Sequence, residues 1–187
     1  SSVATASALL GEVAMAAERM SEIVRAVKGY AYLDQAPVQR VDLRAGLEDT
    51  LVILRHRLRD VEVRRSFADD LPDIEGHGGE LNQVWTNIID NAIDAMDGRG
   101  TLDIGLEADG NAVRVSICDD GPGIPPDLLP RLFEPFLTTK PQGVGTGLGL
   151  HIAHQVVARH GGRLEVTSHP GRTCFAVTLP GVQPRDV

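Results

Sequence analysis

The sequence predicts an α+β fold, a two-layer sandwich of helices on a mixed β-sheet, preceded by one long helix. From residue 43 to residue 180, segments with the apolar period of a helix alternate with segments in which apolar and polar residues follow each other as in a strand. Each predicted strand has one apolar face, so a single layer of helices is enough to cover the sheet. The chain has 187 residues, 42% of them hydrophobic, which is enough for one such core and one appended element.

Apolar and small residues in the first part of the chain recur at alternating spacings of three and four. They are Leu10, Val13, Ala17, Met20, Val24, Val27 and Ala31. This heptad pattern predicts a long helix that packs against another helix, since one helix cannot bury such a stripe alone. Pro37 interrupts the period, and we expect residues 34–43 to form a linker. The domain boundary is therefore placed after residue 36.

The following elements are predicted from the period of their apolar residues. Helices are expected at residues 43–58, 80–96 and 147–160, and strands at residues 61–67, 102–106, 113–117, 163–167 and 173–179. Asp109 and Gly110 predict the turn of a hairpin between two of these strands. The Pro- and Gly-rich segment 121–146 is too long for a simple connection, which is typical of lids over binding sites.

Charge and cysteine content exclude several classes of protein. The net charge of −8 disfavours a nucleic-acid-binding surface. The sequence has no apolar run of about 18 residues and no signal-peptide pattern. Cys118 and Cys174 both lie in strand-like runs, and we expect them to be small core residues of a reduced, cytoplasmic protein rather than a disulfide or a metal site.

The helix predicted at residues 80–96 has a polar stripe beside its apolar face. The stripe consists of Glu80, Gln83, Asn87, Asn91 and Asp94. A solvated face is the ordinary explanation, but such faces are usually rich in Lys, and residues 66–98 contain neither Lys nor Arg. Amide and carboxylate oxygens are suitable ligands for Mg²⁺. When the protein supplies few ligands, this ion is also bound by the phosphates of a substrate.

Two glycine-containing stretches complete the candidate site. Asp119 ends a predicted strand and is followed by Gly121 and Gly123, so the backbone can approach a planar ligand while the carboxylate accepts from an exocyclic amine. An ordinary Asp-Gly turn is the alternative. The stretch Lys140 to Leu150 has the spacing of neither a P-loop nor a Rossmann turn, but glycines before a helix start favour an anion. An ordinary flexible loop remains the alternative there.

Five short motifs, "NIIDNAIDAM", "DDGPGIP", "LFEPF", "TTK" and "GTGLGL", occur in this order from Asn87 to Leu150. They resemble the N, G1, F and G2 boxes of the ATP-binding domain of histidine kinases, within the gyrase–Hsp–MutL–kinase ATPase superfamily. The resemblance covers about residues 41–180 and implies the Bergerat ATP-binding fold, with ATP and Mg²⁺ as cofactors.

The resemblance also implies roles for individual residues. Asp119 would bind the adenine amine, Gly121 and Gly123 would form the adenine wall, and Thr173 would lie close to the adenine. Asn91 would bind Mg²⁺ and Asn87 would lie near the phosphates. Backbone N–H groups of the lid would contact the phosphates, and these belong to Gly145, Thr146, Gly147, Leu148 and Gly149.

Two residues depart from the pattern that this resemblance implies. Asp94 stands where many histidine kinases have a Lys or Arg, so Lys140 becomes the candidate for a cationic phosphate contact and the one possible catalytic residue. Asn87 stands where hydrolysing relatives such as MutL have a general base, which an amide cannot replace. This difference favours phosphoryl transfer over hydrolysis.

Residues 1–36 resemble the second helix of a dimerisation hairpin, and residues 37–187 are the predicted catalytic domain. No phosphoacceptor motif occurs, so we expect the chain to be cut within the hairpin and to pass the γ-phosphoryl group to a histidine that it lacks. A sensor histidine kinase implies a homodimer, a response regulator and a cytoplasmic location, without nucleic acid. The alternatives are a nucleotide-gated dimerisation module without transfer activity and an anti-sigma-type protein-serine kinase.

Overall fold

The computed structural model describes residue 13, residues 38–140 and residues 145–182. Apart from Val13, the predicted N-terminal helix lies outside these residues, as does the proposed boundary after residue 36. Within the described part of the chain, no helix is both long and apolar enough to cross a membrane.

A five-stranded sheet forms one layer of the domain. Its strand order is β2 (Asp60–Phe67), β4 (Arg99–Asp109), β5 (Ala112–Asp119), β7 (Arg172–Pro180) and β6 (Arg163–His169). The β2–β4 pair is parallel and the other three pairs are antiparallel, so the sheet is mixed, as predicted.

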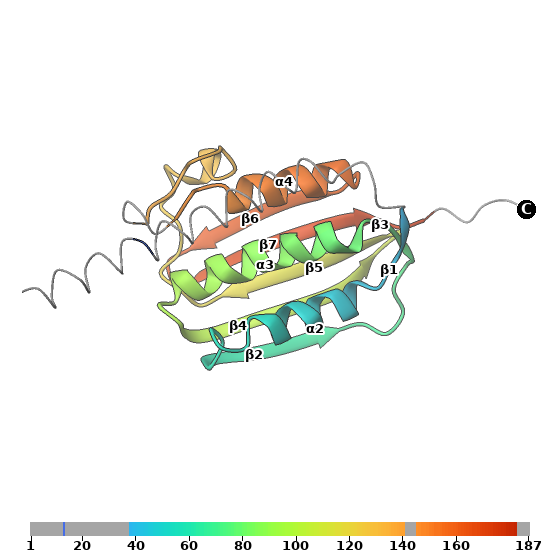
Figure 1. Ribbon diagram of the computed structural model, residues 1–187, viewed down its shortest axis with the longest axis horizontal. Helices are drawn as coiled ribbons and strands as arrows, with labels where there is room; N and C mark the ends of the chain where they lie inside the picture. Colours follow the sequence, from blue (N-terminus) through green and yellow to red (C-terminus); the bar gives the residue numbers. More distant parts are fainter. Residues whose placement is uncertain (1–12, 14–37, 141–144, 183–187) are drawn as a thin grey trace, which may run out of the picture.

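Three helices form the second layer and cover one face of this sheet (Figure 1). They are α2 (Leu43–Ile53), α3 (Gly78–Ala95) and α4 (Gly149–Arg159). The apolar side chains of α3, among them Leu81, Trp85 and Ile88, are fully buried between the layers. Alternate residues of β4 and β5 complete the core from the sheet side. The predicted two-layer sandwich is confirmed.

The structure contains a second, small sheet that was not predicted from the sequence. Strand β1 (Gln39–Val41) pairs with β3 (Ile74–Gly76), and only three residues of each take part. Residues 34–43 were expected to form a linker, which is wrong for residues 39–41. Three residues are too few to show a period of two, so only the pairing partner identifies them as a strand.

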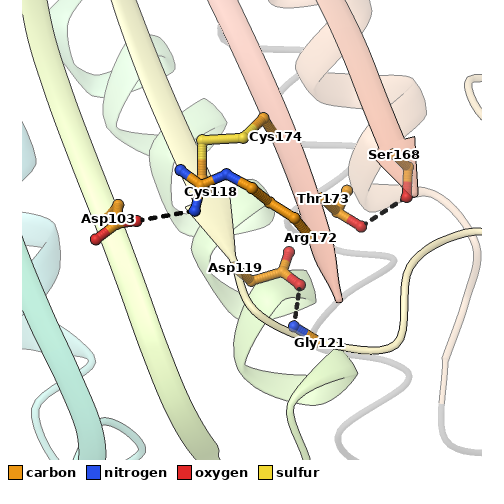
Figure 2. The surroundings of a disulfide bond; sticks show 8 residues. All are labelled: Asp103, Cys118, Asp119, Gly121, Ser168, Arg172, Thr173 and Cys174. Atoms are coloured by element: carbon orange, nitrogen blue, oxygen red, sulfur yellow. Dashed lines mark hydrogen bonds and ion pairs between the residues drawn. A yellow bond between two sulfur atoms is a disulfide. The ribbon is translucent and has the colours of Figure 1, made fainter. Parts of the chain in front are cut away.

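The two cysteines form a disulfide, which corrects the prediction that they are unpaired core residues. Cys118 and Cys174 are directly opposite each other on the neighbouring strands β5 and β7, with 4.0 Å between their Cα atoms (Figure 2). They are 56 residues apart in sequence. The strand-like runs around each cysteine predicted two strands but could not show that these strands are neighbours.

His160 connects the end of α4 to the start of α3. Its side chain is 4% exposed. Its Nε2 accepts a hydrogen bond from the N–H of His77 at 3.0 Å, so the ring proton is on Nδ1 and is donated to the carbonyl oxygen of Val156 at 2.8 Å. The position of α4 against α3 therefore depends on a neutral histidine with both nitrogens in use.

Replacing His160 with Ala is expected to lower the free energy of unfolding by about 1–3 kcal/mol, because the partly buried N–H of His77 loses its acceptor. Denaturant unfolding of the two proteins measures the difference. The matched control is His56→Ala, which changes an exposed histidine and should have almost no effect. Equal losses for the two variants would contradict the structural role of His160.

Candidate functional site

Three elements bring the predicted site residues together at one end of the domain. The C-terminal half of α3, the end of β5 and the start of α4 lie at the left in Figure 1. The side-chain Nδ2 of Asn87 in α3 donates to the carbonyl oxygen of Gly149 in α4 at 3.0 Å. A Cβ atom at Gly121, just after β5, would lie 3.2 Å from the carbonyl oxygen of Ala95 in α3.

The polar stripe of α3 faces the segment that leads into and forms α4. Arg159 donates to Glu80 at 3.1 Å, at the end of α4. Asn87 binds the first residue of α4, and Asp94 forms an ion pair with Lys140. Three of the five stripe residues therefore have partners between residues 140 and 159, so the stripe is not an ordinary solvated surface.

Asn91 lies one turn after Asn87 on the same side of α3. Its side chain is half-buried and makes no hydrogen bond to another described residue. The described residues also contain no group of three or more His, Cys, Asp or Glu placed to hold a metal ion. A hard cation at Asn91 would thus use an amide oxygen together with oxygens from water and from a ligand.

Asp119 places a carboxylate inside the protein at the end of β5. The residue is 2% exposed, and its Oδ1 accepts a hydrogen bond from the N–H of Gly121 at 3.0 Å. Burial raises the pKa of Asp119 above its ordinary value, while the N–H of Gly121 acts in the opposite direction. A desolvated carboxylate gains from an additional donor, and an amine of a ligand can supply one.

The two glycines after Asp119 allow a close approach that no side chain permits. A Cβ atom at Gly121 would lie 2.7 Å from Oδ1 of Asp119. Gly123 has φ of +87°, and a Cβ atom there would lie 2.6 Å from the carbonyl oxygen of His169. The turn is therefore packed against the β6–β7 connection, and its backbone forms a wall beside the carboxylate.

Thr173 lies beside Asp119 on the neighbouring strand. The two residues are opposite each other in the β5–β7 pair, and Thr173 is 3% exposed. Its hydroxyl is 2.9 Å from that of Ser168 on β6 (Figure 2). Ser168 was not predicted from the sequence, because a serine near a turn is common and carries no signal of its own.

Lys140 is held by one carboxylate of α3. Its ammonium pairs with Asp94, and the same carboxylate pairs with Arg57, which also contacts Asp90. The predicted phosphate contact of Lys140 remains a prediction, and in this structure the lysine neutralises Asp94. Arg57 was missed because it lies 37 residues from Asp94 in sequence.

The glycine-rich residues before α4 form a turn that is closed by backbone contacts. Gly147 has φ of +66°, and its carbonyl oxygen accepts from the N–H of Phe136 at 3.0 Å. A Cβ atom at Gly145 would lie 2.9 Å from Cδ of Lys140. Thr146 accepts from the N–H of Leu148 at 3.4 Å, and α4 begins at Gly149, two residues later than predicted.

The start of α4 has no side-chain cap among the described residues. The residue before the helix is Leu148, and none of the described side chains bonds the first N–H groups of α4. These N–H groups carry partial positive charge and point out of the helix toward the end of the domain where Asn91 and Asp119 lie. The arrangement offers an anion site, a cation ligand and a buried acceptor at the same end.

Comparisons with known proteins identify the family and several relatives of this chain. Residues 76–183 match the family model described as histidine kinase-, DNA gyrase B-, and HSP90-like ATPase. Sporulation kinase A of Bacillus subtilis is 38% identical over 136 residues, which are 72% of this chain and 22% of that protein. Sensor histidine kinase ZraS of Escherichia coli K12 is 32% identical over 171 residues, which are 90% of this chain and 36% of that protein. The chain thus spans about a third or less of these two relatives.

Solved structures show the same fold. The mycobacterial sensor histidine kinase MprB superposes with a TM-score of 0.70 and 30% identity, over 79% of this chain and all of that chain. Full-length ShkA, solved in complex with AMPPNP, gives a TM-score of 0.74 and 29% identity, over 89% of this chain and 36% of that chain.

Proposed function

The chain belongs to the family of histidine kinase-, DNA gyrase B-, and HSP90-like ATPases and carries the ATP-binding catalytic core of a sensor histidine kinase, and from this premise we propose that it binds Mg·ATP and transfers the γ-phosphoryl group to a histidine outside this sequence. The observation that carries the proposal is the buried carboxylate of Asp119 beside the backbone of Gly121, a residue without a side chain. Asp119 ends β5 and Asn91 belongs to the C-terminal half of α3, and these parts lie at the same end of the domain as the start of α4 (Figure 1).

In the proposed complex, Asp119 accepts from the exocyclic amine of adenine, and Gly121 and Gly123 form the wall beside the ring. Thr173 lies at the edge of the ring next to Asp119 because the two residues are neighbours across β5 and β7. The triphosphate extends toward α4, where the N–H groups of Gly145, Thr146, Gly147, Leu148 and Gly149 supply donors.

The residues around Asn91 fit a magnesium ion bound with a phosphate. Asn91 offers an amide oxygen without a described protein partner, while Asn87 is used to hold Gly149. The ion supplies screening of the phosphate charges when it is bound. Asn87 therefore acts on the phosphates through the position of the α4 N-terminus rather than by direct contact.

The absence of a general base at residue 87 supports phosphoryl transfer rather than hydrolysis. Asn87 is an amide and cannot take a proton from water. In phosphoryl transfer the protein mainly positions the reactants and screens their charge, which hydrogen-bond donors and lysines can do. We propose that the accepting histidine belongs to a helical hairpin of a cytoplasmic-facing homodimer that includes residues 1–36, and that a response regulator receives the phosphoryl group next.

The isolated chain is expected to bind ATP without phosphorylating itself on histidine, because it lacks an acceptor motif. Incubation with radioactive ATP, followed by acid and base treatment, measures histidine-linked label. Adding a protein that carries residues 1–36 together with the preceding helix of the hairpin should restore acid-labile label in trans. Acid-labile label on the isolated chain, or its absence after the hairpin is added, would contradict the proposed transfer.

Lys140→Ala is expected to weaken ATP binding by about ten- to a hundredfold, with ADP affinity nearly unchanged. The reason is that a contact to the γ-phosphate is charge-assisted and contributes about 1.5–3 kcal/mol, and ADP lacks this phosphate. In this structure Lys140 pairs with Asp94, so the lysine must leave that carboxylate to reach a phosphate.

Asp94→Asn is the matched variant for this contact, because it weakens the hold on Lys140 and should strengthen ATP binding relative to ADP. Calorimetric titration of both nucleotides into both variants decides the role of Lys140. An equal loss for ATP and ADP would assign Lys140 to the structure of the turn, and no loss would leave it a surface lysine.

A further inference from the structure

Ser168 connects two parts of the adenine end of the site. Its Oγ accepts a hydrogen bond from the N–H of Ile124 at 2.8 Å, and it is 2.9 Å from the hydroxyl oxygen of Thr173. Ile124 follows the glycine turn that begins after Asp119. One half-buried hydroxyl therefore contacts both the turn that forms the adenine wall and the threonine beside the carboxylate.

The sheet register places the three side chains in one row. Asp119 is opposite Thr173 in the β5–β7 pair, and Thr173 is opposite Ser168 in the β6–β7 pair. Residues opposite each other on neighbouring strands point to the same face. Figure 2 shows the row across the three strands, with Asp119 in contact with Gly121 and Ser168 in contact with Thr173.

The Ser168–Thr173 hydrogen bond can form in either direction, because either hydroxyl can donate. Ser168 has one proton, and its oxygen already accepts from Ile124. If Thr173 donates, the proton of the half-buried serine goes to solvent. If Ser168 donates, the proton of Thr173, which is 3% exposed, has no acceptor among the described residues and needs one from a ligand. A ligand acceptor beside Thr173 therefore favours donation by Ser168.

A bound adenine would present the matching acceptor at this place. N1 is adjacent to the carbon that carries the exocyclic amine, so an amine on Asp119 places N1 toward a neighbour of Asp119. Thr173 is that neighbour, and cross-strand neighbours have Cβ atoms about 4.5–5.5 Å apart. N1 of adenine is an acceptor, whereas N1 of guanine carries a proton and would meet a second donor.

We propose that Ser168 is a positioning residue that sets base specificity: by donating to Thr173 it turns the threonine proton toward N1 of the bound adenine, while its contact with Ile124 holds the adenine wall. This inference rests on the proposed function, because it assumes the adenine contact of Asp119. It assigns a role to a residue that does not touch the nucleotide.

The test compares ADP with 1-deaza-ADP, in which a C–H group replaces N1. We expect the unmutated chain to bind ADP about three- to tenfold more tightly, as for one neutral hydrogen bond. In Ser168→Ala this ratio should fall to nearly one, as in Thr173→Val, because the threonine proton is no longer directed. Ser168→Thr keeps a hydroxyl and should retain the ratio.

Thr167→Ala is the matched control, since Thr167 is an exposed hydroxyl residue on the opposite face of the same strand and should leave both affinities unchanged. Equal weakening of ADP and 1-deaza-ADP in Ser168→Ala would show that Ser168 only anchors the turn and would overturn the proposal. A ratio near one in the unmutated chain would overturn it without any variant. No binding of ADP to the unmutated chain would instead overturn the proposed function itself.

Discussion

Replacing Asn91 with Ala is expected to abolish Mg²⁺-dependent nucleotide binding and to leave the fold intact. The amide oxygen of Asn91 is the protein ligand that we propose for the ion. The loss of a residue that merely orients a metal ligand already lowers metal affinity by about ten- to a hundredfold. Loss of the ligand itself should therefore lower metal affinity by about a hundredfold or more. The side chain makes no hydrogen bond to other described residues, so its removal leaves no buried group without a partner.

Calorimetric titration of ATP and ADP with Mg²⁺ and with a chelator measures this effect, and thermal unfolding without nucleotide checks the fold. Gln83→Ala is the matched control, since Gln83 lies on the same stripe of α3 about 12 Å toward its N-terminus, at 1.5 Å per residue. An unchanged affinity of Asn91→Ala in the presence of Mg²⁺ would remove Asn91 from the site.

Replacing Asp119 with Asn is expected to weaken ATP binding by about ten- to a hundredfold, the equivalent of one charge-assisted hydrogen bond. The amide can still accept from the N–H of Gly121, so the turn keeps its contact. Its own NH₂ group, however, repels the adenine amine and suits the 6-oxo group of guanine. The preference for ATP over GTP should therefore shrink together with the affinity. Equal binding of ATP and GTP to the unmutated chain would refute the role of Asp119.

The same substitution is expected to leave stability unchanged or to raise it at neutral pH. Burial raises the pKa of Asp119 in the folded protein, so the stability linked to its bound proton is present at low pH and is lost as pH rises through the folded pKa. At pH 7 the ionised carboxylate therefore costs stability, and Asn removes this cost. Melting temperatures of the two proteins at pH 7 measure it, and a large loss in the Asn variant would mean that Asp119 supports the fold.

Local patterns in the sequence were sufficient to predict α2, α3, α4 and the strands of the five-stranded sheet, and they indicated the candidate site residues. The period of apolar residues predicted α3 and its polar stripe because a helix repeats within a few residues. The glycines around Asp119 and before α4 could be interpreted because a close backbone approach demands glycine at particular positions. Each of these signals lies within one segment of the chain.

The pairing of distant residues was decided only by the tertiary structure. The sheet order makes Cys118 and Cys174 neighbours, and the same register puts Ser168 and Asp119 on either side of Thr173. Packing of α2 against α3 brings Arg57 to Asp94, where Lys140 also binds. The physical reason is that a local period fixes which way a side chain faces on its own element, whereas its partner depends on which elements pack side by side.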